Sequence, residues 1–203
     1  MASPGSVKFD GQIRAAVQEL KGLNVKAIRP AAVQALNRVA TTAVGRTVKA
    51  VSTQTQVQPK VIKKRAYAKK ANTRSLQSLV RFYAREINYG ALLTPAQSRK
   101  LVAESGPKFT KTGKRRKGKG FITVGSGAYK QRVERGFVVQ GKKKPTVLQR
   151  KGSARLPLNA PSFRIYKDAV RLTPKVVFET VNDRLNKEFV AAINNKLQRA
   201  LNR

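Results

Sequence analysis

The feature that most constrains this chain is a long segment without a single acidic residue. Between Glu19 and Glu86 there is no Asp or Glu, whereas fifteen Lys and Arg fall in that interval. Cations concentrated in this way repel one another, so polyanions or acidic protein partners should stabilise the folded chain. Whatever fold this segment adopts, we expect it to present a basic surface.

The first part of the segment has the periodicity of a helix. Pro30 suits the first helical position, because the N–H that proline lacks is not needed there. The apolar residues that follow recur at spacings of three and four, which places them on one helical face: Val33, Leu36, Ala40, Val44, Val48 and Val51. The sequence therefore predicts a long helix in the N-terminal half.

A second, strongly basic helix is predicted from Pro59 to about Lys70. Its thin apolar stripe consists of Val57, Ile62 and Ala66, and its cations are Lys60, Lys63, Lys64, Arg65, Lys69 and Lys70. After Asn72 the period changes from helical to two, which predicts a strand over 76–87. Residues 88–90 carry a turn signal, and 91–93 are expected to form a short partner strand.

The segment 105–120 is rich in Gly and Lys and breaks any helix. Seven of the twelve residues over 108–119 are cations: Lys108, Lys111, Lys114, Arg115, Arg116, Lys117 and Lys119. We predict a long loop or hairpin extension whose order depends on a partner. The alternative is a soluble, mobile loop without a binding role.

Short strands and turns follow this extension. Strands are predicted over 121–124, 136–140 and 146–150, and the last two should form a hairpin around the basic turn at 141–145, which contains Lys142, Lys143 and Lys144. Residues 155–158 are at best an edge strand, because Pro157 cannot donate to a ladder.

Helices are also predicted near both ends. Asp10 is expected to cap a helix over 11–21, and Thr173 should cap the C-terminal helix with Pro174 at its first position. That last helix has an apolar stripe and two ion pairs four residues apart, Arg184 with Glu188 and Asp183 with Lys187. The stripe consists of Phe178, Val181, Leu185, Phe189, Ile193 and Leu197. The element order predicts a single α+β domain over 1–203, with the long helix and the C-terminal helix packed on an antiparallel sheet.

The composition excludes several classes of protein. The chain has 203 residues and a formal net charge of +35, and it contains no Cys and no His. A disulfide scaffold and a thiolate metal site are therefore excluded, and the usual general base is missing. No stretch approaches the roughly 20 apolar residues of a membrane span, and the N-terminus lacks a signal-peptide pattern. We expect no membrane contact and a reducing cytoplasm before assembly.

The acidic residues do not form a catalytic cluster. A nuclease would be the natural enzyme for so basic a chain, but nucleases hold divalent metal with clustered carboxylates. The closest set here, Glu179, Asp183 and Glu188, is better explained by ordinary ion pairs on a helix surface. No glycine-rich segment matches a phosphate-cradling loop. We predict no enzyme activity and no cofactor.

The cations carry the functional prediction instead. The sequence has no zinc-finger spacing, basic zipper or paired-aromatic strand motif, so contacts to nucleic acid should be made through phosphates without regard to sequence. The candidate DNA-binding or partner-binding residues are the cations of the basic helix, of 105–120 and of the turn at 141–145. For the basic helix, the alternative is a solvated face that only aids solubility.

Several short segments resemble a known family. They are Ala35-Leu36-Asn37-Arg38-Val39-Ala40, the basic segment 59–70, Gly136-Phe137-Val138, and Arg155-Leu156-Pro157-Leu158 followed by Pro161-Ser162. Together they resemble the minor tail protein Z family of lambda-like phages and prophages, also called tail completion proteins. The resemblance implies a small α+β virion protein at the head-proximal end of the tail, not an enzyme.

The resemblance also implies partners. A hexameric ring around the DNA channel would contact tail terminator, tail tube or neck proteins, and genomic duplex DNA through phosphates. The protein would reside in the virion tail, after a period in the host cytoplasm. The alternative is a sequence-independent nucleic-acid-binding protein of ribosomal or nucleoid type, although two long amphipathic helices exceed what a mostly extended RNA-binding protein needs.

Overall fold

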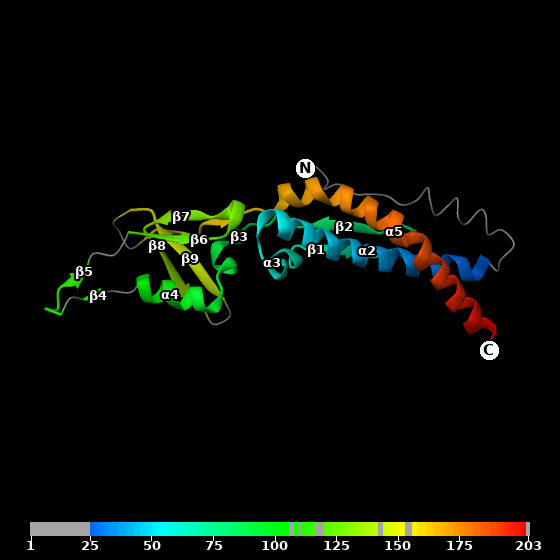
Figure 1. Cartoon of the computed structure of the whole chain (residues 1–203), viewed down its shortest axis with the longest axis horizontal. Coiled ribbons are helices and arrows are strands. Elements are labelled where there is room, and N and C mark those ends of the chain that lie inside the picture. Colours follow the sequence, from blue (N-terminus) through cyan, green and yellow to red (C-terminus); the bar gives the residue numbers. More distant parts are fainter. Residues whose placement is uncertain are drawn as a thin grey trace. The chain divides into compact units, whose positions relative to one another are not determined.

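The computed structural model describes residues 25–105, 108–109, 111–116, 120–141, 144–152 and 156–201. These residues combine helices with small antiparallel sheets, which confirms the predicted α+β class (Figure 1). In place of one sheet, the described strands form five small ones. The predicted helix over 11–21 lies outside the described residues.

The chain divides into two compact units, which are described separately. The first unit contains residues up to Ser52, Ile62–Tyr83 and the chain from Tyr166 onward, and the second contains Thr53–Val61 and Ala84–Ile165. The expectation of a single domain stays a prediction.

Two long helices dominate the first unit: α2, Val25–Thr55, and α5, Tyr166–Leu201 (Figure 1). They run antiparallel, because Arg38 of α2 pairs with Glu188 of α5 whereas Arg46 pairs with Asp183. The buried residues of both helices include small side chains: Ala31, Ala32, Ala35, Ala40 and Ala43 in α2, and Ala169 and Ala192 in α5.

The prediction for α2 is correct for most of the apolar stripe but not for the start. Four of the six stripe residues are buried as expected, and the other two, Val33 and Val44, are half-buried. Pro30, however, lies inside the helix and not at its first position, since α2 begins at Val25.

The predicted start of the C-terminal helix is wrong. α5 begins at Tyr166, so Thr173 is an interior residue whose hydroxyl donates to the carbonyl oxygen of Ala169 at 2.5 Å. A proline inside a helix removes one backbone hydrogen bond, and here burial of residues on both sides of Pro174, such as Ala169 and Val177, keeps the helix continuous.

The predicted stripe of α5 is only partly correct. Val181 and Phe189 are buried, but Phe178 is 62% exposed and the residue before it, Val177, is buried in its place. The buried face of the helix therefore includes Val177 and Thr180, which the spacing of large apolar residues did not indicate.

The predicted basic helix over 59–70 is wrong beyond its first turn. α3 covers only Pro59–Lys63, and β1, Ala66–Lys69, pairs antiparallel with β2, Leu79–Phe82. The strand predicted over 76–87 is thus confirmed in part. Ala66 lies opposite Phe82 and Ala68 opposite Val80, so β1 presents its small residues to the inward side of β2, which lies against α5. This pairing overrides the helical preference of Ala and Lys.

Strands and short helices build the second unit. The predicted hairpin is confirmed by β8, Gly136–Gln140, paired with β9, Pro145–Arg150, and β6 has the predicted bounds, Phe121–Val124. The other paired strands are β7, Gln131–Glu134, with β6; β10, Leu158–Asn159, at the edge of β9; β3, Ile87–Asn88, with β11, Ser162–Phe163; and β4, Lys108–Phe109, with β5, Arg115–Arg116.

Two features of the second unit correct the sequence prediction. The expected strand over 91–93 is a 3-10 helix, η1, Tyr89–Leu92, because the side chain of Asn88 accepts from the backbone N–H of Gly90 and caps it. A further helix, α4, Pro95–Ser105, was not predicted. Its start is a capping box: Thr94 Oγ1 accepts from the N–H of Gln97 at 3.2 Å, and Gln97 Oε1 accepts from the N–H of Thr94 at 3.0 Å.

Candidate nucleic-acid interface

The cations predicted over 60–70 are distributed over several elements. Lys63 ends α3, Lys64 and Arg65 form the turn that follows, Lys69 ends β1, and Lys70 comes directly after it. All of these side chains are exposed except that of Arg65, which is half-buried. The sixth cation, Lys60, is exposed and belongs to the second unit. The five cations of the first unit therefore surround one β-hairpin and do not line one helix.

The outward side of the β1–β2 hairpin carries aromatic residues among these cations. Residues alternate between the two sides of a strand, so Tyr67 and Lys69 point opposite to Ala66 and Ala68. On β2 the register places Arg81 across from Tyr67, and the N–H of Tyr83 donates to the carbonyl of Arg65 at 2.8 Å. The rings of Tyr67 and Tyr83 stack, with centroids 4.9 Å apart and planes inclined by 20°.

We call this surface the tyrosine face, defined by Arg65, Tyr67, Lys69, Arg81 and Tyr83. Sequence reasoning missed the aromatic pair because it assigned Tyr67 to a helix and Tyr83 to a strand. The signal that could have found it is the period of two in the short run from Ala66 to Lys69.

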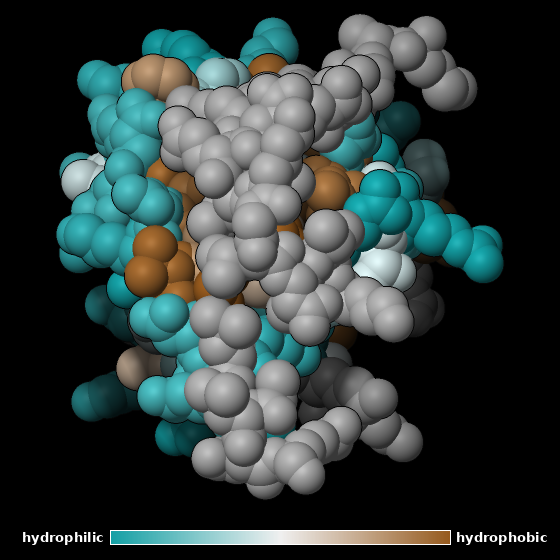
Figure 2. All heavy atoms as spheres, turned by 90° about the vertical axis from the view of Figure 1, so that its right-hand side faces the viewer, coloured by the Kyte–Doolittle hydropathy of each residue, from teal (hydrophilic) through white to brown (hydrophobic). Residues whose placement is uncertain are grey.

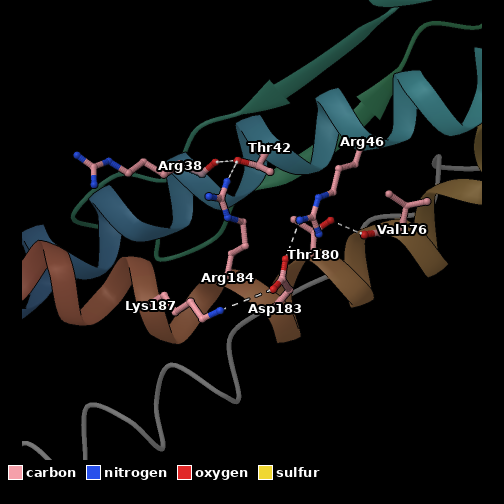
Figure 3. Close-up of polar contacts among 8 residues, drawn as sticks. All are labelled: Arg38, Thr42, Arg46, Val176, Thr180, Asp183, Arg184 and Lys187. Atoms are coloured by element: carbon pink, nitrogen blue, oxygen red, sulfur yellow. Dashed lines mark hydrogen bonds and ion pairs between the residues drawn. The ribbon is translucent and has the colours of Figure 1, made fainter.

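Two acids of α5 join it to α2, and Figure 3 shows one of them, Asp183. Arg46 Nη2 lies 2.6 Å from Asp183 Oδ2, and Arg38 Nη1 lies 3.2 Å from Glu188 Oε2. The hydrogen bond from Arg46, more than any other contact, lowers the pKa of Asp183 below its ordinary value. Arg184 donates to Thr42 Oγ1 at 3.3 Å.

These contacts correct one predicted pairing. Arg184 was expected to pair with Glu188, but each of these residues reaches across to α2. The Asp183–Lys187 pair is present at 4.0 Å, longer than the contact of Asp183 with Arg46. Two of the three acids considered for a metal site, Asp183 and Glu188, therefore form ion pairs that join α5 to α2.

An acid of the second unit has a similar role. Glu86 Oε1 accepts from Arg164 Nε at 3.0 Å, and Glu86 Oε2 accepts from the hydroxyl of Ser162 at 2.6 Å. The serine hydrogen bond, followed by the arginine, lowers the pKa of Glu86. Of the seven acids that lie in the described part of the chain, five form ion pairs with arginine, so few of these seven are left to neutralise other cations.

The remaining candidate cations belong to the second unit. Lys108 and Arg116 occupy opposite register positions of the β4–β5 pair, whereas Lys111, Lys114 and Lys144 are exposed. Four further candidates lie outside the described residues: Lys117, Lys119, Lys142 and Lys143. The binding role of all sixteen cations stays a prediction.

The described residues contain no group of three acidic, Cys or His residues that could hold a metal ion, and none of their helices is long and apolar enough to cross a membrane. In the first unit an open groove of about 600 Å³ is lined by polar and charged side chains such as Asn37, Arg38 and Lys70. The part of the surface drawn in colour in Figure 2 is mostly hydrophilic, with scattered hydrophobic patches.

Comparison with known proteins gives one match. The family model described as prophage minor tail protein Z matches residues 12–203, which include both long helices and the tyrosine face. None of the curated proteins and none of the solved structures matches the chain. Since the match covers nearly the whole sequence, the chain belongs to the prophage minor tail protein Z family, a family of phage tail structural proteins.

Proposed function

We propose that this tail protein completes the head-proximal end of a long phage tail and supports the joining of head and tail, without enzymatic activity. Membership of the minor tail protein Z family over residues 12–203 is the observation that carries the proposal. The protein acts in a sixfold ring around the DNA channel, with tail terminator, tail tube or neck proteins as neighbours.

The charge of the protein supports this location. A net charge of +35 on each subunit makes a closed ring unfavourable unless anions compensate it. DNA in the channel supplies about one negative charge per 1.7 Å of axis. Lys63, Lys69 and Lys70 are exposed on the first unit, as is Lys111 on the second, and these side chains can reach phosphates.

The test is deletion of the gene from an inducible prophage, followed by electron microscopy of the lysate. We expect filled heads and separate tails, with few joined particles, and recovery when the intact gene is supplied from a plasmid. Joined, infectious particles at the normal yield would contradict the proposal. Tails that are absent altogether would assign the protein to tail initiation or tube growth.

A further inference from the structure

We propose that the tyrosine face of the β1–β2 hairpin binds unpaired bases of single-stranded DNA. This goes beyond the proposed function, which requires only phosphate contacts with a duplex. The inference is carried by the stacked pair of Tyr67 and Tyr83 and by the cations that surround it on the same side of the hairpin.

The aromatic pair is preformed and accessible. The two rings are held 4.9 Å apart by neighbouring strands, and the side chain of Tyr83 is 49% exposed. The other tyrosine contacts of the described chain have a different role, since Tyr89 and Tyr129 both pack against the buried Phe163. The Tyr67–Tyr83 pair lies on the side of the hairpin opposite to its buried residues, so its outer surface can receive another flat ring.

The cations are placed to hold the backbone of the same strand. Arg81 lies across the ladder from Tyr67, and the backbone of Arg65 bonds that of Tyr83, so each tyrosine has an arginine beside it. Lys69 is exposed at the end of β1. Proteins that bind single strands combine aromatic platforms for bases with cationic grooves for phosphates in this way.

The composition of the surface favours a nucleic acid over an acidic protein. Interfaces with nucleic acid are much more positively charged than interfaces between proteins. The whole interval between Glu19 and Glu86, which includes the hairpin, contributes no acid to this surface. An intact duplex hides its base faces within the stack, so the aromatic pair adds affinity only where bases are unpaired.

The test uses the purified full chain with a fluorescent oligothymidylate and a duplex of equal length, measured by anisotropy at several salt concentrations. Tyr83→Leu should weaken oligothymidylate binding by about 5- to 100-fold, the range expected for one stacked base. Duplex affinity should change less than twofold. Tyr83→Phe should bind like the unchanged chain, because the stacking surface is kept and only the hydroxyl is lost.

Two control variants separate stacking from charge and from general effects. Phe178→Leu removes another exposed aromatic ring of the same unit and should leave both affinities unchanged. Arg81→Gln should weaken binding of both nucleic acids and flatten their salt dependence, since it removes a phosphate contact.

A second measurement tests the inference even if the Tyr83→Leu variant fails to fold. The chain has five Tyr and no Trp, so its intrinsic fluorescence comes from tyrosine. Oligothymidylate stacked on the pair should quench part of this signal, and Tyr83→Phe should reduce the quenched fraction. No quenching, or equal loss of both affinities in Tyr83→Leu, would overturn the inference.

Competition with polyglutamate tests whether the tyrosine face binds an acidic protein and not single-stranded DNA. Displacement of oligothymidylate by polyglutamate at equal charge concentration would overturn the inference in favour of such a protein. These results are independent of the proposed function, because head–tail joining is scored on particles and does not depend on unpaired bases.

Discussion

Single asparagine side chains tie distant segments of this chain together by imitating a strand neighbour. Asn37 of α2 accepts from the N–H of Ala71 at 2.7 Å and donates to its carbonyl at 3.1 Å. In the second unit, Asn88 bonds both the N–H and the carbonyl of Val147 at 2.9 Å. Each amide satisfies two backbone groups that would otherwise lie buried without partners.

Replacing Asn37 should therefore destabilise the first unit more than its half-buried position suggests. Asn37→Ala leaves both polar groups of the buried Ala71 unpaired, which we expect to lower the free energy of unfolding by about 1–3 kcal/mol. Urea unfolding followed by circular dichroism measures this change. Thr41→Ala is the control, because its exposed hydroxyl bonds only within α2 and its loss should cost about 0.5 kcal/mol or less. Equal costs for the two variants would contradict the role given to Asn37.

Gly90 is required by a close approach of two backbones. A Cβ at this position would overlap the carbonyl oxygen of Pro145 and lie 2.9 Å from the Cα of Thr146. Gly90→Ala must push β9 away from η1 and should cost about 1–3 kcal/mol of stability. Gly45→Ala is the matched control: its Cβ meets nothing within 4 Å inside α2, so helix propensity should make that variant more stable. The two thermal midpoints should shift in opposite directions, and a common direction would refute the steric argument.

At the scale of elements, the sequence correctly predicted the strands whose signals lie within one short segment. The bounds of β6 and β8 were predicted, as was the β8–β9 hairpin, because turn residues and alternation lie within each segment. β1 was mistaken for a helix because its strand state depends on pairing with β2, which the residues from Ala66 to Lys69 do not reveal. Because Tyr67 lies in β1, the tyrosine face was not predicted either. α4, by contrast, could have been predicted, since Thr94 and Gln97 have the spacing of a capping box.

The ion pairs between α2 and α5 make their association sensitive to acid. Arg46 lowers the pKa of Asp183 in the folded state, so this pair stabilises the fold above the ordinary pKa of 3.8 and is lost as the pH falls through the lowered value. The pKa of Glu86 in the second unit is also lowered, so its contacts likewise stabilise the fold at neutral pH and are lost in acid.

The prediction is that Asp183→Asn removes part of the pH dependence of stability below pH 3.8 without changing the fold. Unfolding free energies measured from neutral to acidic pH should converge for the two proteins at the acidic end. Because the pair is exposed, added salt should narrow their difference at neutral pH. Curves that stay parallel over the whole range would show that another group is responsible.

At the scale of the whole molecule, charge governs association. With a net charge of +35, copies of the chain repel one another strongly at moderate salt. We expect the purified protein to sediment as a monomer or a loose association and to form a ring only with tail partners or a polyanion. A stable hexamer at moderate salt without either would show that repulsion does not control assembly.

The last prediction decides what the basic extension contacts. β4 and β5 pair there, with Arg115 and Arg116 at the register positions opposite Phe109 and Lys108. If these arginines meet DNA phosphates, Arg115→Ala with Arg116→Ala should reduce the salt slope of duplex binding by about one unit per lost contact and leave sequence preference unchanged. If they meet acidic neighbours in the tail, the same double variant should abolish head–tail joining while DNA affinity and slope stay normal. Measuring slope and particle yield in one variant separates the two, and a normal slope with lost joining would end the DNA-contact hypothesis for this extension.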